Sequence, residues 1–165
     1  MADQNDIRTL ASLIKGIEIA MLTTADREGR MRSRPMATQA IEFDGDLWFL
    51  TSRASHKIDE IEKWPHVNLA YGKPSSGLFV SVSGKALLID DPVKKKLLWS
   101  DAFKAWFPAG VDDPDLAVLK VVAESAEYWQ PPGSASKMLG FLKAIATGKP
   151  QKPDAGQNKE VNLRE

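Results

Sequence analysis

The stretch that decides the fold is residues 30–57, which read RMRSRPMATQAIEFDGDLWFLTSRASHK. It is typical of a strand, a turn, an apolar second strand at 47–52 and the start of a helix. Side chains along a strand alternate between its two faces, so Arg30, Arg32 and Arg34 are expected to share one face. Three guanidinium groups on one face make this stretch a candidate phosphate site.

The loop at 53–57 adds a helix N-terminus to this candidate site. Ser55 is expected to cap the helix, because its hydroxyl can accept a hydrogen bond from the free N–H groups of the first turn. With Lys57 beside it, such a terminus suits a doubly charged phosphate. A simpler alternative stays open, in which the arginines only keep an edge strand solvated and Ser55 is only a cap.

The composition limits the class of the protein and its partners. A chain of 165 residues predicts one domain. Lys+Arg and Asp+Glu are both 22, and this balance disfavours nucleic acid and gives no sign of an anionic membrane partner. No apolar run approaches the roughly 18 residues that a membrane span needs. With Cys 0 there is no disulfide or thiolate metal site, and the start MADQNDIRTL lacks a signal-peptide pattern, so a cytoplasmic protein is expected.

The pattern along the chain predicts an antiparallel barrel with flanking helices. Besides the two strands of the opening stretch, strands are expected at 17–24, 67–71, 78–89 and 116–124, with a bulge at Gly84. Helices are expected at 7–14, 58–64, 93–106 and 138–145. We expect one domain over 1–147 and a mobile tail over 148–165, which is rich in Lys, Pro, Gly and Gln.

Several short phrases of the chain, taken in order, resemble one family. They are residues 21–24 (MLTT), 32–36 (RSRPM), 47–52 (LWFLTS), 55–57 (SHK), 65–69 (PHVNL), 105–108 (AWFP) and 126–129 (AEYW). Their order resembles the FMN-binding split-barrel superfamily of pyridoxamine 5′-phosphate oxidase, and most closely its general stress protein 26-like branch. The resemblance implies a mainly β fold with flanking helices, an antiparallel split β-barrel of the FMN-binding type.

The resemblance also implies a flavin site that lies across a homodimer. A homodimer would also cover the outward face of the strand at 78–89. The positions that match the cofactor-binding residues of the family are Arg34, Pro35, Met36, Ala37, Leu50, Thr51, Ser55, His56 and Lys57. Among them, Met36 and Leu50 would form the wall of the isoalloxazine ring.

The phosphate of FMN would be held by the Arg-bearing strand and the loop that follows the second strand. Arg34 would bind it through two hydrogen bonds, and Lys57 would add a point charge. Thr51 and Ser55 would donate hydroxyl groups. Because side chains at a barrel rim do not close around a ligand, FAD is expected to be accepted as well as FMN.

The chain departs from pyridoxamine phosphate oxidases at three places. It has His56 where they have an arginine and Gln39 where they have a lysine. It lacks their C-terminal Arg-x-His, because its two histidines, His56 and His66, lie far upstream. We therefore expect a flavin-binding general stress protein without that oxidase activity, and no catalytic residue is assigned. The alternatives are an FMN-dependent oxidoreductase with a nicotinamide or small-molecule donor, and a split barrel that binds heme or deazaflavin.

Overall fold

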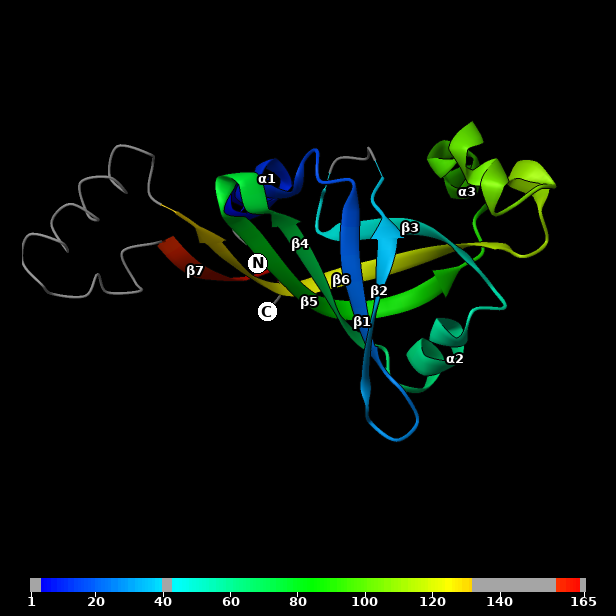
Figure 1. The fold of residues 1–165 in the computed structure, drawn as a ribbon, viewed down its shortest axis with the longest axis horizontal. Coiled ribbons are helices and arrows are strands. Elements are labelled where there is room, and N and C mark those ends of the chain that lie inside the picture. The colour runs from blue at the N-terminus through cyan, green and yellow to red at the C-terminus, as the bar shows by residue number, and fades with distance from the viewer. Residues whose placement is uncertain (1–3, 40–42, 132–156, 164–165) are drawn as a thin grey trace, which may run out of the picture.

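The computed structural model describes residues 4–39, 43–131 and 157–163. Its strands form one seven-stranded antiparallel sheet in the order β2-β1-β4-β5-β6-β3, with β7 also paired to β6 (Figure 1). In chain order the elements are α1 (Gln4–Ile14), β1 (Ile19–Ala25), β2 (Met31–Ala37), β3 (Asp46–Ser52), α2 (His56–Lys63), β4 (His66–Lys73), η1 (Pro74–Ser76), β5 (Leu78–Ile89), α3 (Pro92–Leu98), η2 (Asp101–Ala105), η3 (Gly110–Asp112), β6 (Leu116–Gln130) and β7 (Gln157–Asn162).

The strands β2 and β3 stand at the two ends of the strand order, yet they lie close together in space. Within the described residues they share no ladder. The sheet therefore curls into a barrel that stays open along one side, which confirms the predicted antiparallel split barrel. Pro35 lies in β2, an edge strand, where a residue without an N–H donor is tolerated.

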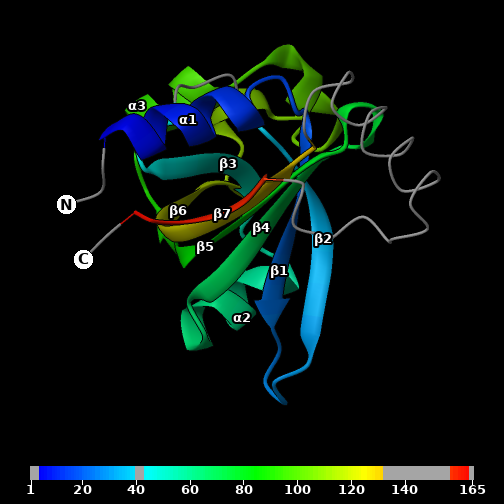
Figure 2. The same ribbon diagram turned by 90° about the vertical axis from the view of Figure 1, so that its left-hand side faces the viewer.

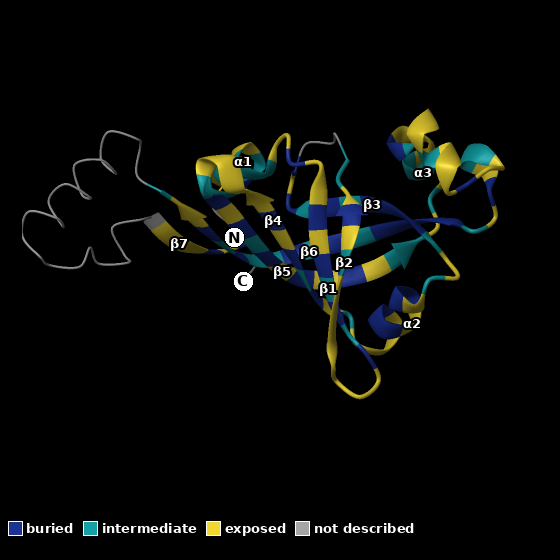
Figure 3. Ribbon diagram, viewed as in Figure 1, coloured by how far each residue is buried: buried dark blue, intermediate teal, exposed yellow. Residues whose placement is uncertain are grey.

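Alternating strand positions fill the interior of the barrel. Along β5, buried and exposed residues alternate, and Figure 3 shows the same alternation on the neighbouring strands. The register of β5 against β6 shifts between Ser83 and Gly84, so the predicted bulge is confirmed. A side chain would not fit there, because a Cβ on Gly84 would lie 2.2 Å from the carbonyl oxygen of Val122.

Two helices lie at opposite ends of the barrel (Figure 2). α1 buries Leu10 and packs Ile7 and Ile14 against the core, as its apolar spacing predicts. α2 lies near the base of the β1–β2 hairpin and buries Ile58 and Ile61. None of the described helices has the length and apolar character that crossing a membrane requires.

The helix predicted at 93–106 is wrong in its extent. α3 begins after Asp91, whose carboxylate accepts hydrogen bonds from two N–H groups of the first turn, but it ends at Leu98. The chain becomes extended at Trp99, and η2 follows. Trp99 and Phe103 then pack together, with ring centroids 6.0 Å apart, against an apolar cluster that includes Leu98. The packing of these two partly buried rings outweighs the local helical pattern.

The C-terminal part of the sheet also differs from the prediction. β6 runs to Gln130, beyond the predicted end at residue 124. β3 pairs with β6 only up to Val122, so the edge beyond is available, and β7 pairs with it from Ser125 to Gln130. Residues 157–162 of the predicted mobile tail therefore form a strand that buries Val161. The helix predicted at 138–145 lies outside the described residues.

Candidate functional site

Arg34 is held on the inner side of β2 by two elements. Its Nη1 donates to Oε2 of Glu60 at 2.8 Å and to Oγ1 of Thr24 at 2.7 Å, and its Nη2 donates to Oε1 of Glu60 at 3.3 Å. The two bonds to one carboxylate fix the plane of the guanidinium group. Arg34 is therefore positioned before any ligand arrives.

Glu60 is a buried carboxylate on α2 that sequence reasoning missed. The hydrogen bond from Arg34 lowers the pKa of Glu60; burial opposes this shift, and the hydrogen bond from Thr24 supports it. Glu60 is thus ionised at neutral pH. Its place on the helix offered a signal, because it follows Lys57 by three residues and precedes the buried Ile61, which puts it on the inward face.

Lys57 lies beside the Arg34–Glu60 pair. Its Nζ donates to Oγ1 of Thr51 at 2.7 Å, and both residues are buried. Burial is the main cause that lowers the pKa of Lys57, and the positive charge of Arg34 lowers it further; the carboxylates of Glu60 and Asp115 oppose this shift without cancelling it. Among the described residues Lys57 makes no ion pair, so its hydrogen-bonded partner is a neutral hydroxyl. An anion that entered here would offset an unfavourable arrangement of charge.

The other two arginines of the opening stretch serve the β1–β2 turn. Arg30 Nε lies 2.9 Å and Arg32 Nη2 lies 3.2 Å from Oδ2 of Asp26. Burial would raise the pKa of Asp26, but hydrogen bonds from Arg30 and from the backbone of Glu28 lower it to about 2. The predicted face of three arginines is therefore a chain of ion pairs, in which Arg34 lies closest to Lys57.

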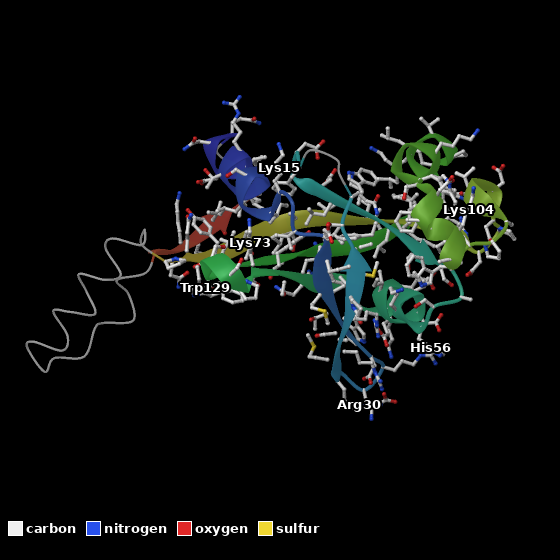
Figure 4. All side chains as sticks on the ribbon, turned by 45° about the horizontal axis from the view of Figure 1, so that its top comes forward. Lys15, Arg30, His56, Lys73, Lys104 and Trp129 are labelled. Atoms are coloured by element: carbon white, nitrogen blue, oxygen red, sulfur yellow. The ribbon has the colours of Figure 1, made fainter. Side chains whose placement is uncertain are left out.

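The loop before α2 is held by Asp115 rather than by its own serine. The N–H of Ala54 donates to Oδ1 of Asp115 at 2.9 Å, and the N–H of Arg53 donates to its carbonyl oxygen at 2.8 Å. Ser55 occupies the N-cap position, but its side chain makes no capping hydrogen bond, so that part of the prediction is wrong. His56 begins α2 and is exposed; Figure 4 shows it toward the same end of the molecule as Arg30, away from Lys15.

The remaining predicted site residues point in different directions. Met36 lies in the main core, whereas Leu50 lies in a second apolar cluster with Leu98 and Phe107. The two side chains therefore belong to different apolar clusters, and their contact with a flavin ring stays a prediction. Pro35 and Ala37 are exposed on the outward face of β2.

The donor set fits a phosphate group. A guanidinium, an ammonium and a hydroxyl come together from β2, α2 and β3, in Arg34, Lys57 and Thr51. A phosphate has three strong acceptor oxygens, and these are the donors that bind it best in proteins. Ser55, the N-cap residue of α2, adds a hydroxyl that the helix does not use.

Comparison with known proteins points to one family. A family described as "Pyridoxamine 5′-phosphate oxidase like" matches residues 5–154. General stress protein 26 of Bacillus subtilis is 31% identical over 127 residues, which cover 74% of this chain and 87% of that protein. Protein bli-3 of Neurospora crassa is 30% identical over 155 residues, which cover 87% of this chain and 74% of that protein. The solved structure of the general stress FMN/FAD binding protein of Xanthomonas citri is 28% identical, covers 80% of this chain and 93% of its own, and has a TM-score of 0.67.

Proposed function

This chain belongs to the pyridoxamine 5′-phosphate oxidase-like family, and from this premise we propose that it is a general stress protein that binds a flavin nucleotide. The ligand is FMN, and FAD is accepted as well. A similar protein is named for binding FMN and FAD. Oxidation of pyridoxamine 5′-phosphate is not part of the proposed function, since neither His56 nor His66 stands in an Arg-x-His motif.

One observation carries the proposal: two cationic side chains, Arg34 and Lys57, lie close together. Glu60 hydrogen-bonds to Arg34, whereas Lys57 donates to the neutral hydroxyl of Thr51. The phosphate of a flavin nucleotide would supply a negatively charged acceptor for a direct hydrogen bond from Lys57. Phosphate binding would then raise the pKa of Lys57 toward its ordinary value. In the free protein, burial and the charge of Arg34 both disfavour the charged form of this lysine.

Each residue has a separate task in this proposal. Glu60 and Thr24 hold Arg34 so that its guanidinium is oriented before binding, which lowers the entropy cost of capturing the ligand. Lys57 supplies a charge from α2, and the hydroxyls of Thr51 and Ser55 complete the donors. When bound, the flavin supplies the redox chemistry, and the protein supplies its orientation and surroundings.

The test is a fluorescence-quench titration of FMN, FAD and riboflavin against the parent and its variants. Arg34→Ala and Lys57→Ala should weaken FMN binding by roughly tenfold to a hundredfold, the value of a hydrogen bond to a charged group. Arg34→Ala should cost more, because a guanidinium makes two bonds in fixed geometry. Riboflavin has no phosphate, so its affinity should change little. FAD should bind within a thousandfold of FMN.

Controls separate loss of binding from loss of folding. Arg34→Ala removes the shortest ion pair of the buried Glu60, which would keep only Thr24 and the more distant Arg32, so the Arg34→Ala/Glu60→Gln double variant removes both charges together. Arg27→Ala, an exposed arginine in the same hairpin, serves as the matched control. Circular dichroism reports folding in each case. The phosphate site is misplaced if folded Arg34 variants keep parental FMN affinity or lose riboflavin as severely as FMN.

A further inference from the structure

A cavity of about 830 Å³ is lined by residues of α1, the helix at the end of the barrel opposite to α2, which carries Lys57 (Figure 2). It is bounded by α1, the start of β1, the residues after β2 and the start of β3. Its buried lining is apolar and aromatic, with Ile17, Phe43, Leu47, Phe49 and Tyr71. Cavities of this size hold small organic ligands in other proteins.

The barrel core separates this cavity from the candidate phosphate site. On the inward face of β2 and its continuation, Arg34 belongs to the phosphate site and Thr38 lines the cavity, while the buried Met36 stands between them. β3 repeats this order, with the buried Phe49 between Thr51 and Leu47. A layer of packed side chains therefore closes the interior path from one to the other. The cavity is a second place, distinct from the phosphate site.

Tyr71 gives the cavity its polar anchor. The side chain is 3% exposed and lines the cavity, yet its hydroxyl has no hydrogen-bond partner among the described residues. Among the described residues no side-chain oxygen is both enclosed and without a partner, so the hydroxyl oxygen of Tyr71 is open to the cavity that the side chain lines. Burial also raises the pKa of Tyr71 far above its ordinary value, so the group stays neutral and can donate. A ligand with an acceptor oxygen would satisfy it.

The charged residues of the lining are either exposed or paired. Arg8, Lys15 and Glu18 are exposed, and Asp46 lies 2.6 Å from Lys120 in an ion pair. The buried walls of the cavity thus carry no unpaired charge, and they offer aromatic rings. We propose that the cavity under α1 binds an uncharged, flat aromatic molecule whose carbonyl or phenol oxygen accepts a hydrogen bond from Tyr71.

The probe is Nile red, an uncharged planar dye with a ring carbonyl, whose fluorescence rises in apolar surroundings. The parent should bind it saturably. Tyr71→Phe keeps the ring but removes the hydroxyl, and should weaken binding by about threefold to tenfold. Ala11→Phe fills the cavity from α1 and should weaken binding more than tenfold. Tyr128→Phe, the other tyrosine of the chain, does not line the cavity and should bind as the parent does.

Each result decides. Circular dichroism confirms folding, and Tyr71→Phe should melt no lower than the parent, because it removes no hydrogen bond within the described protein. Absence of saturable binding, or equal affinity in the parent, Tyr71→Phe and Ala11→Phe, overturns the proposal. Displacement of the dye by FMN or riboflavin also overturns it, because the cavity would then belong to the flavin site. Retained dye binding in Arg34→Ala supports a separate site.

Discussion

At the scale of single residues, Glu60 determines how the candidate site behaves. It accepts hydrogen bonds from Arg34 and Thr24 while lying 7% exposed. The sequence identifies Arg34, Lys57 and Thr51 as donors, but it does not reveal that a carboxylate holds one of them. That contact joins residue 34 on β2 to residue 60 on α2, which are far apart in the sequence. No local sequence pattern predicts such a contact.

The pH dependence of stability should report the buried carboxylates. The pKa of Asp26 is lowered to about 2, and the pKa of Glu60 is also lowered. In the unfolded chain these groups titrate near 4. A carboxyl group whose pKa is lower in the folded state stabilises the fold above its unfolded pKa, and this contribution is lost as pH falls through the folded pKa. Stability should therefore fall steeply from about pH 5 to pH 2.

Urea denaturation from pH 7 to pH 3 measures this effect in the parent and in Glu60→Gln. The variant should start less stable at pH 7 and lose less on acidification, because its side chain has no proton to bind. Glu62→Gln, an exposed position on the same helix, is the matched control and should follow the parent. Parallel curves for the parent and Glu60→Gln would show that Glu60 is not a stabilising carboxylate.

At the scale of elements, the sequence predicts the bounds of regular strands better than it predicts which strands pair with one another. The bounds of β5 and its bulge follow from alternation and from Gly84, since both are local. The break after α3 is not predictable in this way, because the same apolar pattern fits a continuous helix and the observed chain, in which Trp99 and Phe103 pack partly buried against the cluster of Leu98. The sequence also does not predict β7. Its pairing partner is the edge of β6 at residues 125–130, about 30 residues earlier in the chain, so no local pattern indicates the pairing.

The bulge in β5 should tolerate no side chain at its glycine. Gly84→Ala would place a Cβ 2.2 Å from the carbonyl oxygen of Val122, so the backbone of β5 or β6 must move. Overpacking of this kind costs about 1–3 kcal/mol. In Gly72→Ala the new Cβ would meet only the ring of Phe79, at 3.4 Å, so its cost should be smaller. Urea denaturation compares the two, and equal stabilities would contradict the close packing of β5 on β6.

At the scale of the whole molecule, one face of the sheet carries a row of apolar residues that nothing in the described part of the chain covers. Met21 pairs with Pro35 on β2 and with Ala70 on β4, and all three are exposed, so an apolar row crosses three strands. Ile19, 51% exposed, and Phe79, 47% exposed, extend it along β1 and onto β5. Contiguous exposed apolar surface of this kind commonly marks an interface.

This face leads us to predict a homodimer. A two-fold axis brings the same patch of both subunits together, so a row that is apolar along its length can cover itself. β5 contributes Phe79 to this apolar row. The sequence predicts that a homodimer covers the outward face of this strand. Pro35 and Ala37 also lie on this face, which would place two predicted cofactor-binding positions at the subunit boundary.

Sedimentation velocity at micromolar concentration tests the dimer with a matched pair of variants. Met21→Glu puts a charge in the middle of the row and should give monomers, because an unpaired charge is costly to bury. Met31→Glu places the same charge at the hairpin end of β2, where the side chain is 67% exposed, and should leave the dimer intact. If the flavin site is shared between subunits, Met21→Glu should also weaken FMN binding while Met31→Glu does not. A parent that sediments as a monomer with flavin bound would contradict both the dimer and the shared site.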